Sequence, residues 1–236
     1  MPPMRENGGR RAPNVLLEVC VETFEDAVAA ADIGANRIEL NAALTLDGLT
    51  PSVDQLRKTR QAVGIPVVTM ARPRAGDFVY STGDLHSLRR EVSLMLENGA
   101  DGVAFGLVTD SRSVDVRRCK PLVREIHDAR KQAVFHRAFD VLPKPLDELE
   151  QLIDLGFDRV MTSGGESTAE AGSAMIASLR RRAAGRIEIL PAGGIRPANV
   201  VRLLARTDCD QIHSSARDPS GRMSRKSLAE LVRAIR

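Results

Sequence analysis

Four ionisable side chains lie within or at the ends of short apolar segments, namely Glu18, Glu39, Arg72 and His136. A core built only for stability would carry Val, Ile or Leu at such positions, because burying a charge without a partner costs several kcal/mol. Two explanations are open: an internal ion-pair network in which Glu18, Glu39 and Arg72 satisfy one another, or a ligand-binding cavity. The shared position of these residues at segment ends favours the cavity.

Proton transfer and anion binding are the chemistry that these residue types support. Glu39 and His136 form the expected acid–base pair, because a partly buried carboxylate and an imidazole can both be tuned to titrate near neutral pH. Arg72 and Arg74 are expected to clamp an anionic group, since guanidinium groups suit carboxylate and phosphate. Glu18 would orient or neutralise its neighbours. For His136 alone, an ordinary hydrogen-bonded histidine at a strand end is an equally good interpretation.

Three similar short sequences, beginning at Gly34, Gly99 and Gly156, indicate how these residues are positioned. In each, a helical pattern ends at a glycine, which tolerates the left-handed dihedrals of a helix C-cap, and an apolar segment follows. The intervals between the three leave room for two strand–helix units each. This rhythm predicts an α/β fold, a single-domain (β/α)8 TIM barrel.

The chain of 236 residues has the length that such a barrel needs. Residues 1–13, rich in Pro, Gly and Arg, are predicted to form a disordered arm, and residues 14–236 the barrel. Thr23 is expected to cap the first helix, Thr50 with Pro51 to start the second, and Arg196 with Pro197 to open the seventh. Strands are expected at 15–20, 37–41, 66–72, 102–105, 133–138, 159–163, 186–191 and 211–215.

In a β/α barrel the loops after the strands form the functional face, because strand ends converge there. Alternate positions at these ends carry a set of side chains that are mostly polar. They are Glu18, Cys20, Glu39, Asn41, Met70, Arg72, Arg74, His136, Asp140, Ser163, His213 and Ser215.

A second candidate feature is the glycine turn at Gly193 and Gly194, together with Ser215 after the last strand. Loops after strands seven and eight often bind phosphate, because free backbone N–H groups and a helix N-terminus favour an anion. The glycines could equally serve only to allow a tight turn. With the strand-end residues, this turn predicts a small anionic or phosphorylated metabolite as ligand.

Composition excludes several other classes. A net charge of +3 with one Tyr and no Trp makes nucleic acid a poor candidate partner. The three cysteines, Cys20, Cys119 and Cys209, lack the spacing of a metal knuckle. The sequence shows neither a leader pattern nor a long apolar span, so no membrane association is predicted, and a reducing cytoplasm is expected.

Residues 70–80, from Met70 through Arg72 and Arg74 to Tyr80, resemble the CutC family of copper homeostasis proteins. Further segments share the resemblance, at 17–22, 37–40, 48–52, 105–107, 135–140, 162–164 and 213–217. The resemblance implies a β/α barrel, a cytoplasmic protein that functions in copper homeostasis, copper ion binding, and assembly into a homodimer or larger homo-oligomer.

Cys20 matches the first cysteine of the copper site that the resemblance implies, whereas the second cysteine is replaced by Asn41. Copper(I) prefers thiolate, thioether and imidazole ligands, so an amide oxygen is a poor substitute. A copper(I) site here would therefore combine Cys20 with Met70, His136 or His213. The alternative is a TIM-barrel enzyme acting on the small anionic metabolite, with Glu39 and His136 in acid–base roles.

Overall fold

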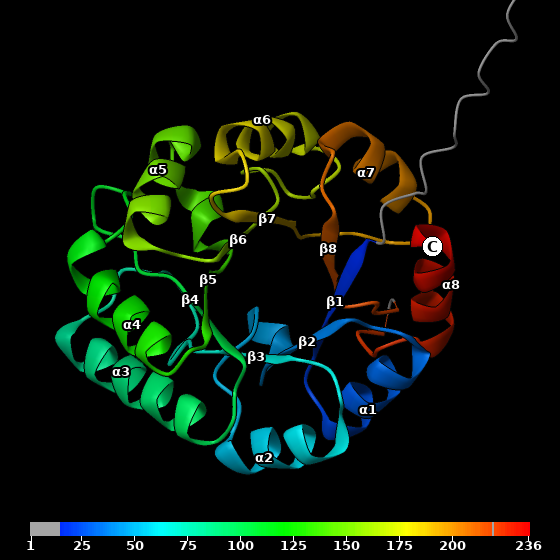
Figure 1. The fold of residues 1–236 in the computed structure, drawn as a ribbon, viewed down its shortest axis with the longest axis horizontal. Helices are drawn as coiled ribbons and strands as arrows, with labels where there is room; N and C mark the ends of the chain where they lie inside the picture. The colour runs from blue at the N-terminus through cyan, green and yellow to red at the C-terminus, as the bar shows by residue number, and fades with distance from the viewer. Residues whose placement is uncertain (1–14, 219) are drawn as a thin grey trace, which may run out of the picture.

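The computed structural model describes residues 15–218 and 220–236, which form a ring of eight parallel strands surrounded by eight helices (Figure 1). The strands are β1 (Leu16–Val21), β2 (Arg37–Leu40), β3 (Val67–Met70), β4 (Gly102–Phe105), β5 (Gln132–Phe135), β6 (Arg159–Thr162), β7 (Glu188–Pro191) and β8 (Gln211–Ser214). They pair in the order β7-β6-β5-β4-β3-β2-β1-β8. Because β7 and β8 also lie in contact, the sheet curls into a nearly closed barrel.

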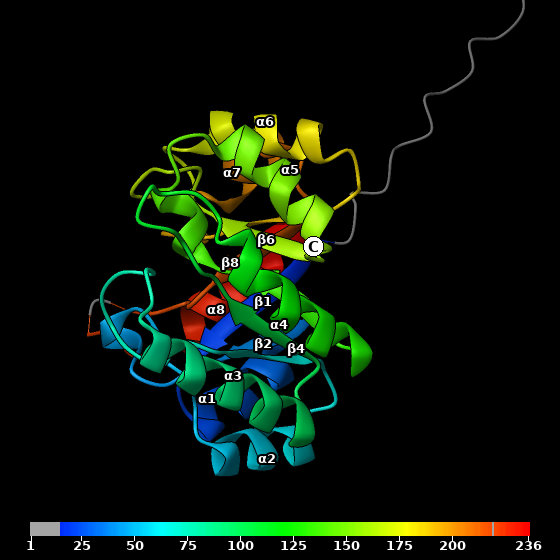
Figure 2. The same cartoon turned by 90° about the vertical axis from the view of Figure 1, so that its left-hand side faces the viewer.

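The helices cover the outer face of the barrel. They are α1 (Phe24–Ile33), α2 (Val53–Ala62), α3 (Thr82–Glu97), α4 (Val116–Asp128), α5 (Pro145–Leu155), α6 (Ser173–Ala183), α7 (Val200–Thr207) and α8 (Arg225–Ile235). Two short 3-10 helices, η1 (Leu44–Leu46) and η2 (Arg137–Val141), follow β2 and β5. The long connections after the strands gather on one side of the molecule, at the left in Figure 2.

The predicted (β/α)8 barrel is confirmed, and every predicted strand is present. The prediction at 102–105 coincides with β4, and the others differ only at their ends. Thr23 caps α1 by accepting the backbone N–H of Asp26 at 3.1 Å. Gly34 and Gly156 end α1 and α5 with φ values of 117° and 86°, in the left-handed region expected of helix C-caps.

Two predicted helix starts are wrong. α2 begins at Val53 because the side chain of Ser52, rather than Thr50, caps it. The Thr50 hydroxyl instead accepts the backbone N–H of Arg72 at 2.8 Å and so joins two loops. α7 begins at Val200, because the residues from Arg196 form a turn first. The predicted arm, residues 1–13, lies outside the described residues.

The main apolar core lies between the strands and the helices, while the barrel interior combines charged and polar side chains with two small apolar clusters. Strand side chains alternate between the two. On β1, Leu17 and Val19 face the helices and are fully buried in the core, whereas Glu18 binds Arg37 on the inside. Among the described residues no helix has the length and apolarity that crossing a membrane requires.

Candidate functional site

A cavity of about 470 Å³ opens at the carboxyl ends of the strands. This is the face at which the sequence predicts the functional residues to converge. The structure brings most of them into the lining, and those that line it are Cys20, Glu39, Asn41, Met70, Arg72, His136, Asp140, Gly193, Gly194, His213 and Ser215.

Three predicted residues are not part of this lining. Glu18 contacts His213 from below the cavity. The Arg74 guanidinium binds Asp77 and Asp84 at 2.9 and 3.0 Å and packs over the Tyr80 ring, so it holds its own loop together instead of reaching into the cavity. Ser163 donates its hydroxyl to Asp140 at 2.9 Å and acts in the loop after β6.

Cys20, Glu39 and His213 form a buried cluster at the bottom of the cavity. Strand register produces it, because parallel pairing sets Cys20 beside Glu39 on β2, and Glu18 beside His213 on β8. One ligand atom from each of the three side chains lies within 4.8 Å of the others. A thiol, a carboxylate and an imidazole at such separations are able to hold a metal ion.

The His213 ring is fixed between two carboxylates. Its Nδ1 lies 2.7 Å from Oε1 of Glu18, and its Nε2 lies 3.8 Å from Oε2 of Glu39. Burial disfavours the charged imidazole, but Glu39 and Glu18 outweigh burial and raise the pKa of His213. Burial likewise opposes the charge on Glu18, yet Arg37 and His213 hold the pKa of this carboxyl well below its usual range.

Cys20 and Glu39 hold their protons more tightly than exposed groups of the same type. Burial and the neighbouring Glu39 carboxylate raise the pKa of the Cys20 thiol, which is therefore protonated at neutral pH. Burial also raises the pKa of Glu39. The Asn41 amide donates to Oε2 of Glu39 at 2.9 Å and to the Cys20 sulfur at 3.4 Å, so it restrains both.

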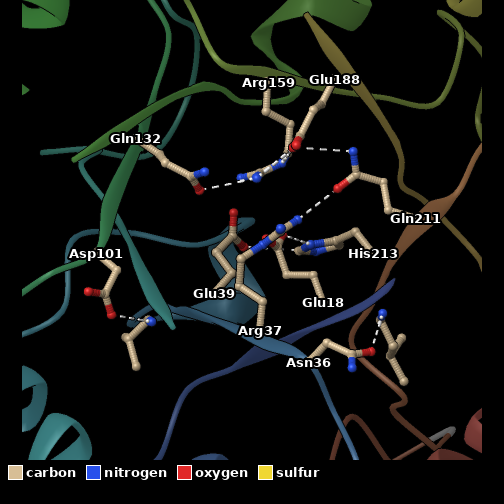
Figure 3. A network of polar contacts seen from close by, with 12 residues as sticks. Glu18, Asn36, Arg37, Glu39, Asp101, Gln132, Arg159, Glu188, Gln211 and His213 are labelled. Carbon is tan, nitrogen blue, oxygen red and sulfur yellow. Dashed lines mark hydrogen bonds and ion pairs between the residues drawn. The ribbon is translucent and has the colours of Figure 1, made fainter. Parts of the chain in front are cut away.

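Below the cluster, an ion-pair network fills the barrel interior (Figure 3). Arg37 binds Glu18 and donates to Gln211 at 3.0 Å, and Arg159 binds Glu188 at 2.6 Å. The sequence left open a network in which Glu18, Glu39 and Arg72 satisfy one another. Glu18 instead pairs with Arg37 and His213, and Arg72 forms no ion pair within the described residues. Sequence reasoning missed Arg37 and Arg159, although both begin strands at positions whose alternation points inward.

Arg72 and His136 lie on the cavity wall and both contact Phe78. The ring centroids of Phe78 and His136 are 5.0 Å apart, and the Arg72 guanidinium lies 5.2 Å from the Phe78 centroid. Burial, assisted by the charge of Arg72, lowers the pKa of His136 to about 3. Since this imidazole stays neutral near pH 7, His213 is better suited than His136 to exchange protons with Glu39.

Asp140 organises a rim loop. Its carboxylate accepts the backbone N–H of Ser163 and the hydroxyl of Thr162, at 2.9 and 2.6 Å, and pairs with Arg137 at 2.8 Å. These contacts occupy both oxygens. Asp140 therefore lines the cavity mainly as a structural residue.

Comparison with known proteins gives consistent results. The family model described as the CutC family matches residues 15–218. A family protein CutC from Treponema denticola is 46% identical over 203 residues, 86% of this chain and 82% of that protein. The human copper homeostasis protein cutC homolog is 41% identical over 206 residues, 87% of this chain and 75% of its own.

Solved structures agree with the sequence relatives. A crystal structure of CutC from Streptococcus agalactiae superposes with a TM-score of 0.81 at 28% identity, covering 89% of this chain and 100% of that one. Phosphoribosylanthranilate isomerase from Thermotoga maritima superposes with a TM-score of 0.61 at 13% identity over 94% of this chain and 98% of its own. The second likeness shows a shared barrel fold alone.

Proposed function

The chain belongs to the CutC family, and on that premise we propose that it acts in copper homeostasis by binding copper(I) through Cys20 and His213, with Glu39 beside them. The observation that carries the proposal is the approach of these three ligand atoms to within 4.8 Å at the bottom of an open cavity. Thiolate and imidazole are ligands that copper(I) prefers, whereas carboxylate suits harder ions. Cys20 and His213 are therefore the ligands in this proposal.

Glu39 serves as the proton acceptor in this arrangement. A metal binds the thiolate and the neutral imidazole, so Cys20 and His213 must each release a proton when copper arrives. The Glu39 carboxylate contacts both, and its raised pKa allows it to take up one proton, that of the thiol, while the imidazole proton passes to solvent through the open cavity. We expect copper affinity to rise with pH for the same reason.

Asn41 stands where the copper site implied by the family resemblance has a second cysteine. Its amide nitrogen lies 3.4 Å from the Cys20 sulfur, so position 41 faces the proposed copper ligands directly. Here the residue restrains Cys20 and Glu39 without supplying a second sulfur. Met70 and Met161 line the same cavity and bring thioether sulfur to its wall.

A copper(I) titration against a chromophoric chelator, without oxygen, tests the proposal. The wild-type protein is expected to withdraw one equivalent of copper(I), and Cys20→Ala and His213→Ala are each expected to weaken binding. Cys119→Ala is the matched control, because Cys119 is buried on α4, outside the cavity lining. Equal affinity in wild type and Cys20→Ala would show that copper does not bind here.

The proposal includes two further properties. All three cysteines are free, which fits the reducing cytoplasm that we propose as the compartment. The family resemblance also implies a homodimer or larger homo-oligomer, which sedimentation equilibrium measures directly. Neither property affects the ligand assignment.

A further inference from the structure

The cavity is much larger than a copper site requires. At about 470 Å³ it falls within the 300–1,000 Å³ typical of small-molecule sites, whereas one water molecule occupies roughly 30 Å³. Cys20, Glu39 and His213 occupy only its bottom, and most of the lining comes from the loops above. The upper part of the cavity therefore has room for a small organic molecule.

Positive charge is concentrated in this upper part. Four arginines line the cavity, and two of them have carboxylate partners, Arg137 with Asp140 and Arg217 with Glu22. Within residues 15–218 and 220–236, neither Arg72 nor Arg196 forms an ion pair. Two cationic groups in the lining are thus left without a counter-charge from the protein.

Arg72 is the more informative of the two, because it is only 3% exposed. Its guanidinium donates to the carbonyl oxygens of Leu46, Gly48 and Gly76 at 2.9, 3.1 and 2.8 Å. These carbonyl groups orient the guanidinium but do not neutralise its positive charge. A buried charge without a counter-ion costs several kcal/mol, which a bound anion would offset.

His136 adds an unused donor to the same wall. Its Nδ1 accepts the backbone N–H of Ala138 at 3.2 Å, so the neutral ring carries its proton on Nε2. Nε2 is buried and has no hydrogen-bond partner in the described part of the chain. An unsatisfied N–H on a residue that lines a cavity calls for an acceptor from a ligand.

The lining carboxylates do not cancel these groups. Glu39 contacts His213 at the bottom, Asp140 is bound by Arg137, and Asp47 lies exposed at the mouth. The turn after β7 adds further donors, which are backbone N–H groups. Its two glycines, Gly193 and Gly194, have φ values of 103° and 67°. The backbone N–H groups of both glycines lack a protein acceptor within the described segments. Successive backbone N–H groups in such turns form concave anion sites.

We propose that the upper cavity binds a small organic anion, a carboxylate or a phosphate monoester, whose charged oxygens contact Arg72, Arg196 and the Nε2–H of His136. The backbone N–H groups of Gly193 and Gly194 supply a second set of donors. This anion site is separate from the copper ligands and does not depend on copper being bound. The two sites share one cavity, so a ligand in the upper part lies above Cys20.

Isothermal titration calorimetry on metal-free protein, at constant ionic strength and without phosphate buffer, tests this proposal. The probes are glycerol 3-phosphate, malonate and uncharged glycerol, so that the two oxyanion classes are separated from each other and from the neutral control. Binding of glycerol 3-phosphate or malonate, but not glycerol, is expected. Cys20→Ala is expected to bind the same oxyanion, which keeps this test independent of the copper proposal.

Two variants locate the anion. Arg196→Gln is expected to weaken oxyanion binding roughly tenfold, because one charge-assisted contact is lost. Arg206→Gln, which removes an exposed arginine from the last turn of α7, is expected to have no effect. Arg72→Lys is a second test, with circular dichroism to verify folding. Failure of both oxyanions to bind wild type, or unchanged binding in folded Arg196→Gln and Arg72→Lys, would overturn the proposal.

Discussion

Glu18 and His213 are 195 residues apart in the sequence, yet Oε1 of Glu18 lies 2.7 Å from Nδ1 of His213. The contact exists because the first and last strands pair and close the barrel between them. It leaves Nε2 of His213 facing Glu39 and Cys20. The proposed copper ligands are therefore positioned by a carboxylate that does not line the cavity itself, an arrangement common around metal-binding histidines.

Glu18→Gln tests this positioning role. We expect copper(I) affinity to fall about 10- to 100-fold, because outer-shell partners of ligating histidines have effects of that size. The pKa of His213, followed by NMR, should fall as well, since the variant removes one of the charges that raise it. Glu22→Gln, directly after the same strand and outside the cluster, is the control. Unchanged affinity and pKa in a folded Glu18→Gln variant would contradict the role.

The Glu18–Arg37 pair should be important for stability. Arg37→Met leaves a carboxylate buried without its principal cation, and such losses cost about 3–5 kcal/mol in free energy of unfolding. Arg182→Met removes an exposed partner of Glu150 and should cost at most about 1 kcal/mol. Urea unfolding measures both. Equal losses of unfolding free energy in the two variants would show that the internal pair contributes no more to stability than an exposed one.

The stability of the metal-free protein should depend on the ionisation of His213. Its pKa is raised above the ordinary value of 6.5, mainly by Glu39 and Glu18 against the opposing effects of burial and Arg37. The stabilisation is therefore fully present below pH 6.5 and is lost as pH rises through the raised pKa. Unfolding free energies measured across this window should decline in wild type and change less in His213→Asn. A parallel decline in both proteins would refute the assignment.

Asn41→Cys should strengthen copper binding. The Asn41 amide nitrogen lies 3.4 Å from the Cys20 sulfur, so a thiol at position 41 adds a second soft ligand to the cluster. We expect a gain in copper(I) affinity under reducing conditions, because thiolate is a preferred ligand of copper(I). Asn199→Cys, in the turn before α7, is a control that adds a thiol elsewhere. No gain in Asn41→Cys relative to that control would place the copper away from position 41.

The sequence predicts the barrel well because its signals are local. Glycine C-caps such as Gly34 and short apolar strands repeat along the chain. Each depends mainly on residues that are close to it in the sequence. The predicted convergence of strand-end residues also holds for Cys20, Glu39 and His213. These features follow from topology and alternation alone.

Side-chain partners were harder to predict than positions. Nothing local in the sequence shows that Arg74 binds Asp84 in the first turn of α3, or that Ser52 rather than Thr50 caps α2. The neutral state of His136 likewise arises from burial and from Arg72, which a distant segment supplies. Such choices depend on tertiary distances, which strand register sets only after the barrel has closed.

X-ray absorption at the copper edge, on protein loaded with one equivalent of copper(I), tests the central claim most directly. The predicted result is one sulfur and one imidazole nitrogen bound to copper, with the sulfur signal lost in Cys20→Ala and the imidazole signal lost in His213→Ala. Spectra that are the same in wild type and Cys20→Ala would show that copper binds elsewhere in the protein.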